Sequence, residues 1–385
     1  MCPAWRCTVT GISSAPERQM PSRVLALIPS QGLGGGIEAY VQAVLDAVRE
    51  LGVEVVELAF TSRSLSSGPA AKARFLARVF RASGSLHRTD TDVLCFHLGL
   101  LPAAMLAHYR LATATPITTF FHGIEIWSGS RIERVLRRRP SIRPVTVSSF
   151  SAGTMVDDRD VGILAPSVPA PLVRDLLAID RGCRPVQDVR MLSVFRLGDY
   201  VLKGGPELVG AVAWLRSEGY SVTLTFAGRD APNELLDRDL ERYGEWLTVV
   251  RSPSEATLVD HYANATLFAL ATRQQGRPRP FGEGFGIVLA EAALAGLPVL
   301  GPASGGSRDA FIEGVTGVSP RDQSLGSLID IIRWMLDHPQ EALVMGTNGR
   351  RWARRAFDPG AYPARVADVV WGQGTYLRWL GLQFA

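Results

Sequence analysis

Two glutamates, Glu283 and Glu291, stand eight positions apart in a largely apolar run, FGEGFGIVLAEAALAGLPVL, residues 281–300. If one helix carried both acids, a rise of about 1.5 Å per residue would separate them by about 12 Å along the axis. That is the scale of a sugar joined through a diphosphate to a ribose. A carboxylate among apolar side chains is costly unless it is hydrogen-bonded, and ligand hydroxyls could supply the bonds. The alternative is structural: Glu283 caps the helix and Glu291 pairs with an arginine.

Two cations follow another predicted strand, in the run VFRLGDYVLKGGPEL, residues 194–208. Arg196 ends the strand, and Lys203 precedes a glycine pair that opens a helix. A guanidinium and an ammonium at these points could together hold an anion such as a diphosphate. Only two of the 41 basic residues are lysines, Lys72 and Lys203, so a lysine at this position is unusual for this chain. The alternative is a solvated surface lysine.

A glycine loop and a histidine also lie where strands are predicted to end, which is where the crevice of a parallel sheet lies. Gly34-Gly35-Gly36 opens a helix, and its glycines would let backbone amides approach an anion. Ile37 replaces the third glycine of a dinucleotide fingerprint, which disfavours a nicotinamide-dependent enzyme. His122 follows an apolar strand, and such histidines are often structural. Glu125 is interpreted as a helix cap rather than as a base for an acceptor hydroxyl.

Together these segments resemble the retaining glycosyltransferase family 4, the glycosyl transferases group 1, with the GT-B fold. The acid pair resembles the E-x7-E donor motif of that family, Arg196 and Lys203 its diphosphate-binding cations, and His122 its His-Gly turn. The resemblance implies that Arg196, Lys203, Glu283 and His122 are catalytic. It implies donor binding by ten further residues: Gly35, Gly36, Gly228, Arg251, Gly284, Phe285, Gly286, Ile287, Val288 and Glu291. The chain departs from the family at Asp230, which replaces a glycine, and at Asp309, which takes the place of the acid in a GGxxE motif.

The resemblance implies an enzyme that moves a sugar from a nucleoside-diphosphate-sugar to an acceptor hydroxyl with retention of configuration. Glu283 would orient the hexose, and Glu291 would bind the ribose. No cofactor and no metal are expected, because the two D-x-D sequences, residues 90–92 and 237–239, fall outside the predicted cleft. Two alternatives stay open. A nucleotide-sugar epimerase on the same fold would need no acceptor, and a non-catalytic subunit would bind the donor without turnover.

The chain has 385 residues, of which 46% are hydrophobic and 20% charged, and this length favours two domains. Apolar runs alternate with amphipathic stretches in two series, which predicts two Rossmann-like βαβ domains facing a central cleft. The predicted order is a disordered extension (1–20), an acceptor domain (21–165), a Pro-rich linker (166–188), a donor domain (189–360) and a C-terminal helix that packs back on the first domain (361–385). The two tail segments 328–357 and 361–380 are predicted as helices.

Positive charge gathers in the first half of the chain. Residues 1–185 carry 21 Lys and Arg against 15 Asp and Glu, whereas the remainder carries 20 against 22. Arg74, Arg78 and Arg81 share one face of a predicted helix, and Arg131–Arg139 forms a second basic cluster. Such a surface could dock on an anionic membrane, and the alternative is an ordinary amphipathic helix with its arginines in water. No binding motif for nucleic acid is present.

Four cysteines without metal-ligand or disulfide spacing indicate a reducing compartment. The first residues lack the pattern of a secretory signal, and no apolar run reaches the roughly 18 residues that a membrane span needs. The sequence therefore predicts a cytoplasmic protein, which the basic helix could place on the inner face of the membrane.

Overall fold

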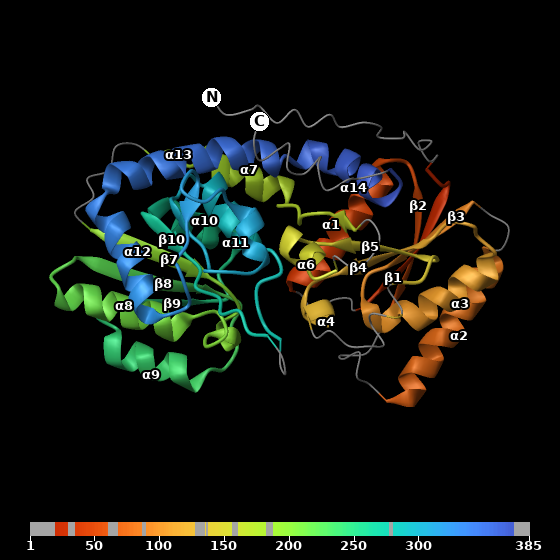
Figure 1. The fold of residues 1–385 in the computed structure, drawn as a ribbon, viewed down its shortest axis with the longest axis horizontal. Coiled ribbons are helices and arrows are strands. Elements are labelled where there is room, and N and C mark those ends of the chain that lie inside the picture. The colour runs from red at the N-terminus through yellow and green to blue at the C-terminus, as the bar shows by residue number, and fades with distance from the viewer. Residues whose placement is uncertain are drawn as a thin grey trace, which may run out of the picture.

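The computed structural model describes residues 20–29, 35–60, 68–86, 90–127, 135, 138–155, 161–181, 188–276 and 280–372. Two domains lie side by side, each built on one six-stranded sheet (Figure 1). The strand order is β2-β1-β3-β4-β5-β6 in the first domain and β12-β11-β10-β7-β8-β9 in the second. The paired strands run parallel in both sheets. The prediction of two Rossmann-like βαβ domains is confirmed.

The strands are short and mostly apolar, as expected where helices cover both faces of a parallel sheet. Those of the first domain are β1 (Arg23–Ile28), β2 (Glu54–Ala59), β3 (Thr91–Cys95), β4 (Ile117–Phe121), β5 (Ile142–Thr146) and β6 (Gly162–Ile163). Those of the second are β7 (Val189–Val194), β8 (Val222–Gly228), β9 (Leu247–Arg251), β10 (Leu267–Ala269), β11 (Val299–Leu300) and β12 (Gly317–Val318). Every residue of β3 and β4 is buried.

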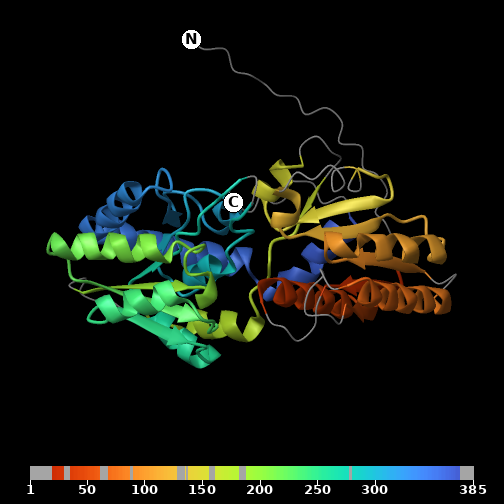
Figure 2. The same cartoon turned by 90° about the horizontal axis from the view of Figure 1, so that it is seen from below.

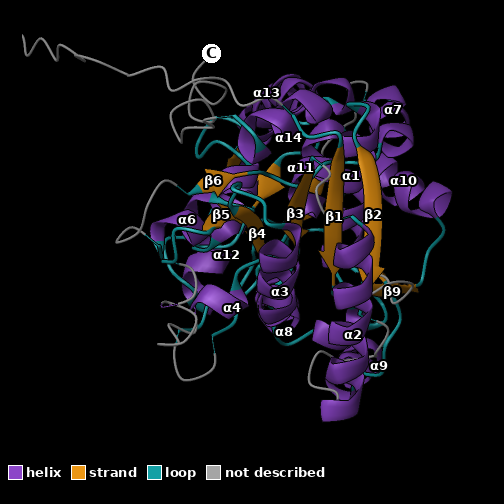
Figure 3. Cartoon of the chain, turned by 90° about the vertical axis from the view of Figure 1, so that its right-hand side faces the viewer, coloured by secondary structure: helices purple, strands orange, loops and turns teal. Residues whose placement is uncertain are grey.

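Helices cover the two sheets. Those of the first domain are α1 (Gly36–Glu50), α2 (Pro69–Ser85), α3 (Leu101–Leu111), α4 (Ile124–Trp127) and α6 (Ser149–Gly153). Those that follow are α7 (Ala170–Ala178), α8 (Gly205–Ser217), α9 (Glu234–Tyr243), α10 (Glu255–Asn264), α11 (Ile287–Leu294), α12 (Leu325–Asp337), α13 (Pro339–Ala356) and α14 (Tyr362–Val370). Single 3-10 turns occupy Leu98–Leu100 (η1), Leu197–Asp199 (η2), Gly306–Ala310 (η3) and Pro359–Ala361 (η4). Figure 3 shows α2 and α3 side by side in front of the first sheet.

The chain passes between the domains twice. The segment predicted as a linker contains α7, which packs against α10 and α11 of the second domain, so only the extended stretch before α7 connects the domains. At the other end α14 returns to the first domain and packs on α1 (Figures 1 and 2). Arg143 Nη1 donates to the carbonyl of Val370 at 2.8 Å, and Trp371 Nε1 donates to Asp92 Oδ2 at 2.9 Å.

The structure differs from the sequence prediction in one helix and in two strands. The single helix predicted over 328–357 is two helices, because Pro339 lacks the N–H that a continuous helix needs and instead begins α13. The sequence analysis does not predict the two-residue strands β6 and β12. Four predicted segments lie wholly or mostly outside the described residues: residues 1–19 of the predicted disordered extension, Gly34, most of the Arg131–Arg139 cluster and the tail 373–385.

The carboxyl ends of the two sheets meet across the domain boundary. Gly284 of the second domain lies so close to the first that a Cβ on it would stand 2.6 Å from the carbonyl oxygen of His122. A Cβ on Gly306 would stand 1.9 Å from the carbonyl oxygen of Gly284 and 2.6 Å from Ser148 Oγ. Glycine is therefore required where the domains touch, and this contact forms one side of the candidate site.

Candidate active site

A pocket of about 690 Å³ opens at the carboxyl ends of β7 and β8, within the size range of small-molecule sites. The second domain supplies most of its walls, and Gly35 and Gly36 of the first domain supply the opposite side. Ten of the residues predicted from the sequence line this pocket: Gly35, Gly36, Arg196, Lys203, Gly228, Glu283, Gly286, Ile287, Val288 and Glu291. The fold therefore brings together segments that are up to 256 positions apart in the sequence.

Lys203 and Glu283 form an ion pair at the pocket wall. Lys203 Nζ lies 2.7 Å from Glu283 Oε2, and the two side chains are 18% and 17% exposed. Thr272 Oγ1 donates to the same carboxylate oxygen at 3.2 Å. Gly204, in the left-handed conformation at φ 73°, turns the chain into α8 directly after the lysine. The ammonium is therefore held in one place and largely buried, with its remaining donors available to a ligand.

Glu283 is not a helix cap, since α11 begins at Ile287 and its N-cap is Gly286, which has a positive φ of 75°. The two glutamates therefore do not share one helix, and the separation of about 12 Å inferred from helical rise does not apply. The structural alternative for this acid is overturned, because its carboxylate accepts hydrogen bonds from Lys203 and Thr272 at the pocket wall.

Arg196 is held by a neighbour that sequence reasoning did not select. Arg196 Nε donates to Asp199 Oδ2 at 2.9 Å, and Nη2 donates to Oδ1 at 2.7 Å. This two-point bond fixes the guanidinium plane while its side chain stays 62% exposed. The hydrogen bonds that Arg196 donates to Asp199 also raise the pKa of Arg196. The arginine is thus oriented before any ligand arrives.

Glu291 is buried, with 9% of its surface exposed, and Tyr262 Oη donates to its Oε2 at 2.8 Å. The predicted alternative of an arginine partner is therefore wrong. Burial raises the pKa of Glu291, while the hydrogen bond from Tyr262 partly opposes that shift. Since Glu291 also lines the pocket, a ligand hydroxyl is the natural second partner for a carboxylate in this position.

The formal charges of the pocket balance. Arg196, Lys203 and Arg229 contribute three cations, and Asp199, Glu283 and Glu291 contribute three carboxylates. Arg229 follows the glycine that ends β8, and the strand-then-glycine turn could have drawn attention to it. The amides at the start of α11, at Ile287 and Val288, add the positive end of a helix. The pocket is therefore polar, and Arg196 and Lys203 each have a carboxylate partner in it.

Four predicted site residues do not line this pocket. Arg251 turns its guanidinium to Asp230 at 2.6 Å and to Asp237 at 2.5 Å, while the next residues, Ser252 and Pro253, line the pocket in its place. Phe285 is 3% exposed and packs edge-to-face on Phe357, so it is a core residue. Gly284 and His122 instead form the domain contact beside the pocket.

His122 lies in a cluster of first-domain side chains at the ends of β3 and β4. Its Nε2 is 2.9 Å from the carbonyl oxygen of Phe96, and its backbone N–H donates to Glu125 Oε1 at 2.6 Å. Glu125 thus takes the capping position that the sequence predicts. His97 Nδ1 accepts from the Gly99 N–H at 2.9 Å, and burial lowers the pKa of His97. These contacts fix both rings at the domain boundary.

The D-x-D acids have structural partners. Asp90 Oδ2 accepts the N–H of Ser22 at 2.9 Å, Asp92 accepts from Thr115 Oγ1 at 2.5 Å, and Asp239 accepts the hydroxyl of Tyr200 at 2.6 Å. Within the described part of the chain, no group of three or more His, Cys, Asp or Glu side chains is arranged to hold a metal ion. No helix that the structure describes is both long and apolar enough to cross a bilayer.

Comparison with known proteins identifies the chemistry. The model of the family "Glycosyl transferases group 1" matches residues 184–352. The chain is 28% identical over 291 residues to the GDP-mannose-dependent alpha-(1-6)-phosphatidylinositol monomannoside mannosyltransferase of Mycolicibacterium smegmatis, covering 71% of this chain and 74% of that one. The Mycobacterium tuberculosis enzyme of the same name is 27% identical over 286 residues, or 70% and 74% of the two chains. The chain is a glycosyltransferase whose second domain is similar to the glycosyl transferases group 1.

Solved structures of glycosyltransferases share the two-domain fold. HepE of Anabaena, in complex with UDP and glucose, superposes with a TM-score of 0.68 at 17% identity, covering 91% of this chain and 99% of that one. A glycosyltransferase of Rickettsia africae gives a TM-score of 0.70 at 14% identity, covering 90% and 98%. The chain therefore has the two-domain GT-B fold that the sequence predicts.

Proposed function

We propose that this glycosyltransferase transfers a hexose, with retention of anomeric configuration, from a nucleoside-diphosphate-sugar to a hydroxyl on a lipid-linked or glycan acceptor. The observation that supports the proposal is the convergence of Arg196, Lys203, Glu283 and Glu291 on one pocket of about 690 Å³. Mannose from GDP-mannose is the first donor to consider, since the mannosyltransferases to which the chain is similar depend on it.

In the proposed mechanism the acceptor hydroxyl attacks from the face that the diphosphate leaves, which retains the configuration. Arg196 and Lys203 contact the diphosphate, where negative charge grows as the glycosidic bond breaks, and the amides of Ile287 and Val288 point at the same group. Each cation already has a carboxylate partner, so the donor phosphates join existing pairs and no bare cation has to be desolvated. The pre-paired site therefore needs little rearrangement on binding.

Glu283 has the position to orient the hexose, because it lies between Lys203 and the domain contact at Gly284 and His122. Glu291 binds the ribose hydroxyls, and Tyr262 holds its carboxylate in place. His122 contacts the sugar from the first domain. Closure of the domains around this set would exclude water and so limit hydrolysis of the donor.

A donor panel tests the proposal. GDP-mannose, UDP-glucose and UDP-N-acetylglucosamine are each added in a thermal-shift measurement, and a nucleotide-sugar that binds raises Tm by mass action. The donor found is then incubated with phosphatidylinositol mannosides or simple glycosides, and the anomer of the product is read by NMR. Because Arg196 and Lys203 supply the positive charge, EDTA is expected to leave the rate within about twofold. Failure of every donor to bind, inversion of the anomer, or a strict metal requirement would each contradict a stated part of the proposal.

We also propose that α2 docks the enzyme on anionic lipid. Arg74, Arg78 and Arg81 are exposed on α2, and Leu76 and Phe80 beside them are 37% and 47% exposed. Phe75 and Val79 are buried in the core, so the exposed apolar side chains form a separate strip from the one that packs on the sheet. A cationic face with an exposed apolar strip is typical of helices that lie on membranes.

Replacing Arg74 and Arg81 together by alanine is expected to weaken binding to phosphatidylserine vesicles about 10- to 30-fold at low salt, since each surface cation contributes about 1 kcal/mol there. Arg78 is left in place because its Nη1 donates to the carbonyl of Ala59 at 2.9 Å and so supports the fold. The matched control, Arg238→Ala with Arg242→Ala on α9, removes the same charge from the other domain. Vesicle sedimentation measures the effect, and equal loss in both double variants would reject a specific role for α2.

A further inference from the structure

One carboxylate joins the two domains directly. Asp309 lies in the turn η3 of the second domain, and Ser149 begins α6 in the first, 160 positions earlier. The Ser149 N–H donates to Asp309 Oδ2 at 2.5 Å, and the Ser149 hydroxyl donates to Oδ1. Asp309 is 5% exposed, so both of its oxygens are satisfied from across the domain boundary. We call this pair the clamp.

The clamp satisfies groups that would otherwise have no partner. Ser148 caps α6, leaving the N–H of Ser149 in the first turn without a partner inside the helix. Asp309 supplies that partner from another domain. Because Asp309 is buried, its carboxylate in turn needs the two hydrogen bonds from Ser149. Separating the domains would therefore break both bonds together, and an unpaired buried carboxylate would have to be rehydrated.

The clamp is continuous with the catalytic wall. Gly306, three residues before Asp309, donates its N–H to the carbonyl oxygen of Glu283 at 2.9 Å and packs against Ser148. Gly284, directly after Glu283, packs against the carbonyl of His122. The same short stretch of the second domain thus carries the glutamate of the pocket and the carboxylate that fixes the first domain. A shift of Asp309 away from Ser149 would move His122 away from Glu283.

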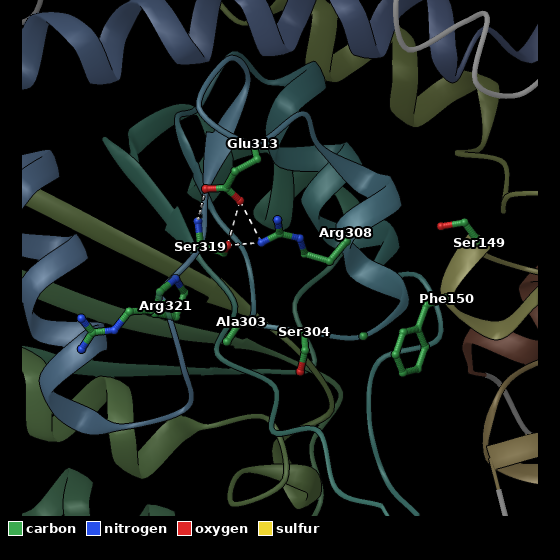
Figure 4. A pocket seen from close by; sticks show the side chains of 10 residues that line it. Ser149, Phe150, Ala303, Ser304, Arg308, Glu313, Ser319 and Arg321 are labelled. Atoms are coloured by element: carbon green, nitrogen blue, oxygen red, sulfur yellow. Dashed lines mark hydrogen bonds and ion pairs between the residues drawn. The ribbon is translucent and has the colours of Figure 1, made fainter. Parts of the chain in front are cut away.

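A second pocket, of about 670 Å³, flanks the clamp on its outer side. Figure 4 shows Ser149 and Phe150 of α6 facing Ser304 and Arg308 of the second domain across this pocket. The guanidinium of Arg308 turns away to Glu313, with Nη1 2.9 Å from Oε2. Side chains of the two domains therefore stand apart here, and at the edge of this opening the Asp309–Ser149 bonds hold the domains together.

We propose that Asp309 is a positioning residue for glycosyl transfer: through Ser149 it holds the first domain, with His122, against the Glu283 loop and so keeps water out of the reacting centre. Donor binding relies almost wholly on the second domain, whose residues line most of the pocket. Loss of the clamp therefore affects transfer and its competition with hydrolysis more than it affects donor affinity.

Asp309→Ala, Asp309→Asn and Ser149→Ala test the proposal, each assayed with GDP-mannose or the donor that the panel selects. In Asp309→Ala we expect kcat for transfer to fall at least tenfold, donor KM to stay within about threefold, and the ratio of hydrolysis to transfer to rise at least fivefold. Small-angle scattering of the donor-free protein is expected to show a larger radius of gyration. Ser149→Ala keeps the backbone donor, so its effects should have the same direction and be smaller.

The matched control is Asp322→Asn. Asp322 Oδ1 accepts the N–H of Ser324 at 2.9 Å and also its hydroxyl, which is the same pair of bonds made within one domain. This variant should leave the hydrolysis ratio and the radius of gyration unchanged. The double variant Ser149→Ala with Asp309→Ala should behave like Asp309→Ala alone, because Asp309→Ala already removes both bonds between the two residues. If Asp309→Ala does not fold, Asp309→Asn and Ser149→Ala decide. A hydrolysis ratio and a radius of gyration equal to wild type in the folded variants would overturn the proposal.

Discussion

Replacing Lys203 by alanine is expected to lower kcat about 100-fold or more while donor KM changes by less than about tenfold. The ammonium lies 2.7 Å from Glu283 in a site where both side chains are largely buried, so its field acts with little screening by water. Removing one preorganised group that stabilises developing charge commonly costs about 100- to 1000-fold in kcat. Steady-state kinetics with saturating acceptor measures the change.

The chain supplies its own control for this experiment. Lys72, the other lysine of the sequence, is exposed on α2, and Lys72→Ala should retain full activity. Glu283→Gln keeps the size of the side chain and should also reduce kcat strongly, because it removes the partner that holds the ammonium. Thermal unfolding of each variant separates loss of chemistry from loss of fold. A Lys203→Ala enzyme with kcat within a few-fold of wild type would show that the lysine only neutralises Glu283.

The fold could be predicted from the sequence because both domains repeat one pattern. Apolar runs such as 23–29 and 189–196 are long enough to be strands, and amphipathic stretches between them leave few alternatives to a parallel sheet. The two-residue strands β6 and β12 carry no periodicity, so only pairing with a neighbour reveals them. Pro339 marked a helix boundary that the long apolar periodicity of residues 328–357 concealed.

Motifs in the sequence predicted the pocket residues, but they did not predict the side chains that hydrogen-bond to them. Arg196, Lys203, Glu283 and Glu291 converge as the resemblance implies. Tyr262, which holds Glu291, lies 29 positions away in a helix where it resembles any core aromatic residue. The resemblance implied that Arg251 binds the donor, and its sequence position does not reveal that its guanidinium pairs with Asp230 and Asp237. Such contacts arise from packing between elements, which single-sequence patterns do not encode.

The paired charges of the pocket suggest how the enzyme avoids a cost that an isolated cation would incur. A largely buried ammonium without a partner would lose hydration that nothing replaces. Glu283 supplies that partner in the donor-free protein, and Asp199 supplies one to Arg196. In the proposed complex each cation contacts phosphate oxygens as well as its carboxylate. Glu291 would then serve donor binding, through the ribose of the leaving nucleotide. The Lys203–Glu283 pair would serve the chemistry, at the bond that breaks.

Glu291→Gln is expected to separate binding from stability: donor KM rises about 10- to 100-fold, kcat changes little, and the protein becomes more stable at neutral pH. The carboxylate makes charge-assisted hydrogen bonds to ribose hydroxyls in the proposed complex, and such bonds contribute about 1.5–3 kcal/mol. These bonds exist equally in the ground state and the transition state, so their loss raises KM rather than lowering kcat.

The stability effect follows from the raised pKa of Glu291, which burial causes. In the folded protein this carboxyl binds a proton at a higher pH than in the unfolded chain, so its ionised form opposes folding above the folded-state pKa. As the pH falls through that pKa, the native carboxyl takes up a proton first and the penalty is relieved. The Tm advantage of Glu291→Gln over wild type should therefore be largest at pH 7 and above and shrink as the pH is lowered. Tyr262 can still donate to the glutamine Oε1, which preserves the packing.

Glu255→Gln is the control, because this exposed carboxylate at the start of α10 also raises the pKa of Glu291, yet it does not line the pocket. Its donor KM should stay within about twofold of wild type. Tyr262→Phe should instead lower Tm, since Glu291 loses its hydrogen bond while remaining buried. If Glu291→Gln gained stability with an unchanged donor KM, the carboxylate would be a structural partner of Tyr262 alone, and the ribose contact would have to be assigned to another residue of the pocket.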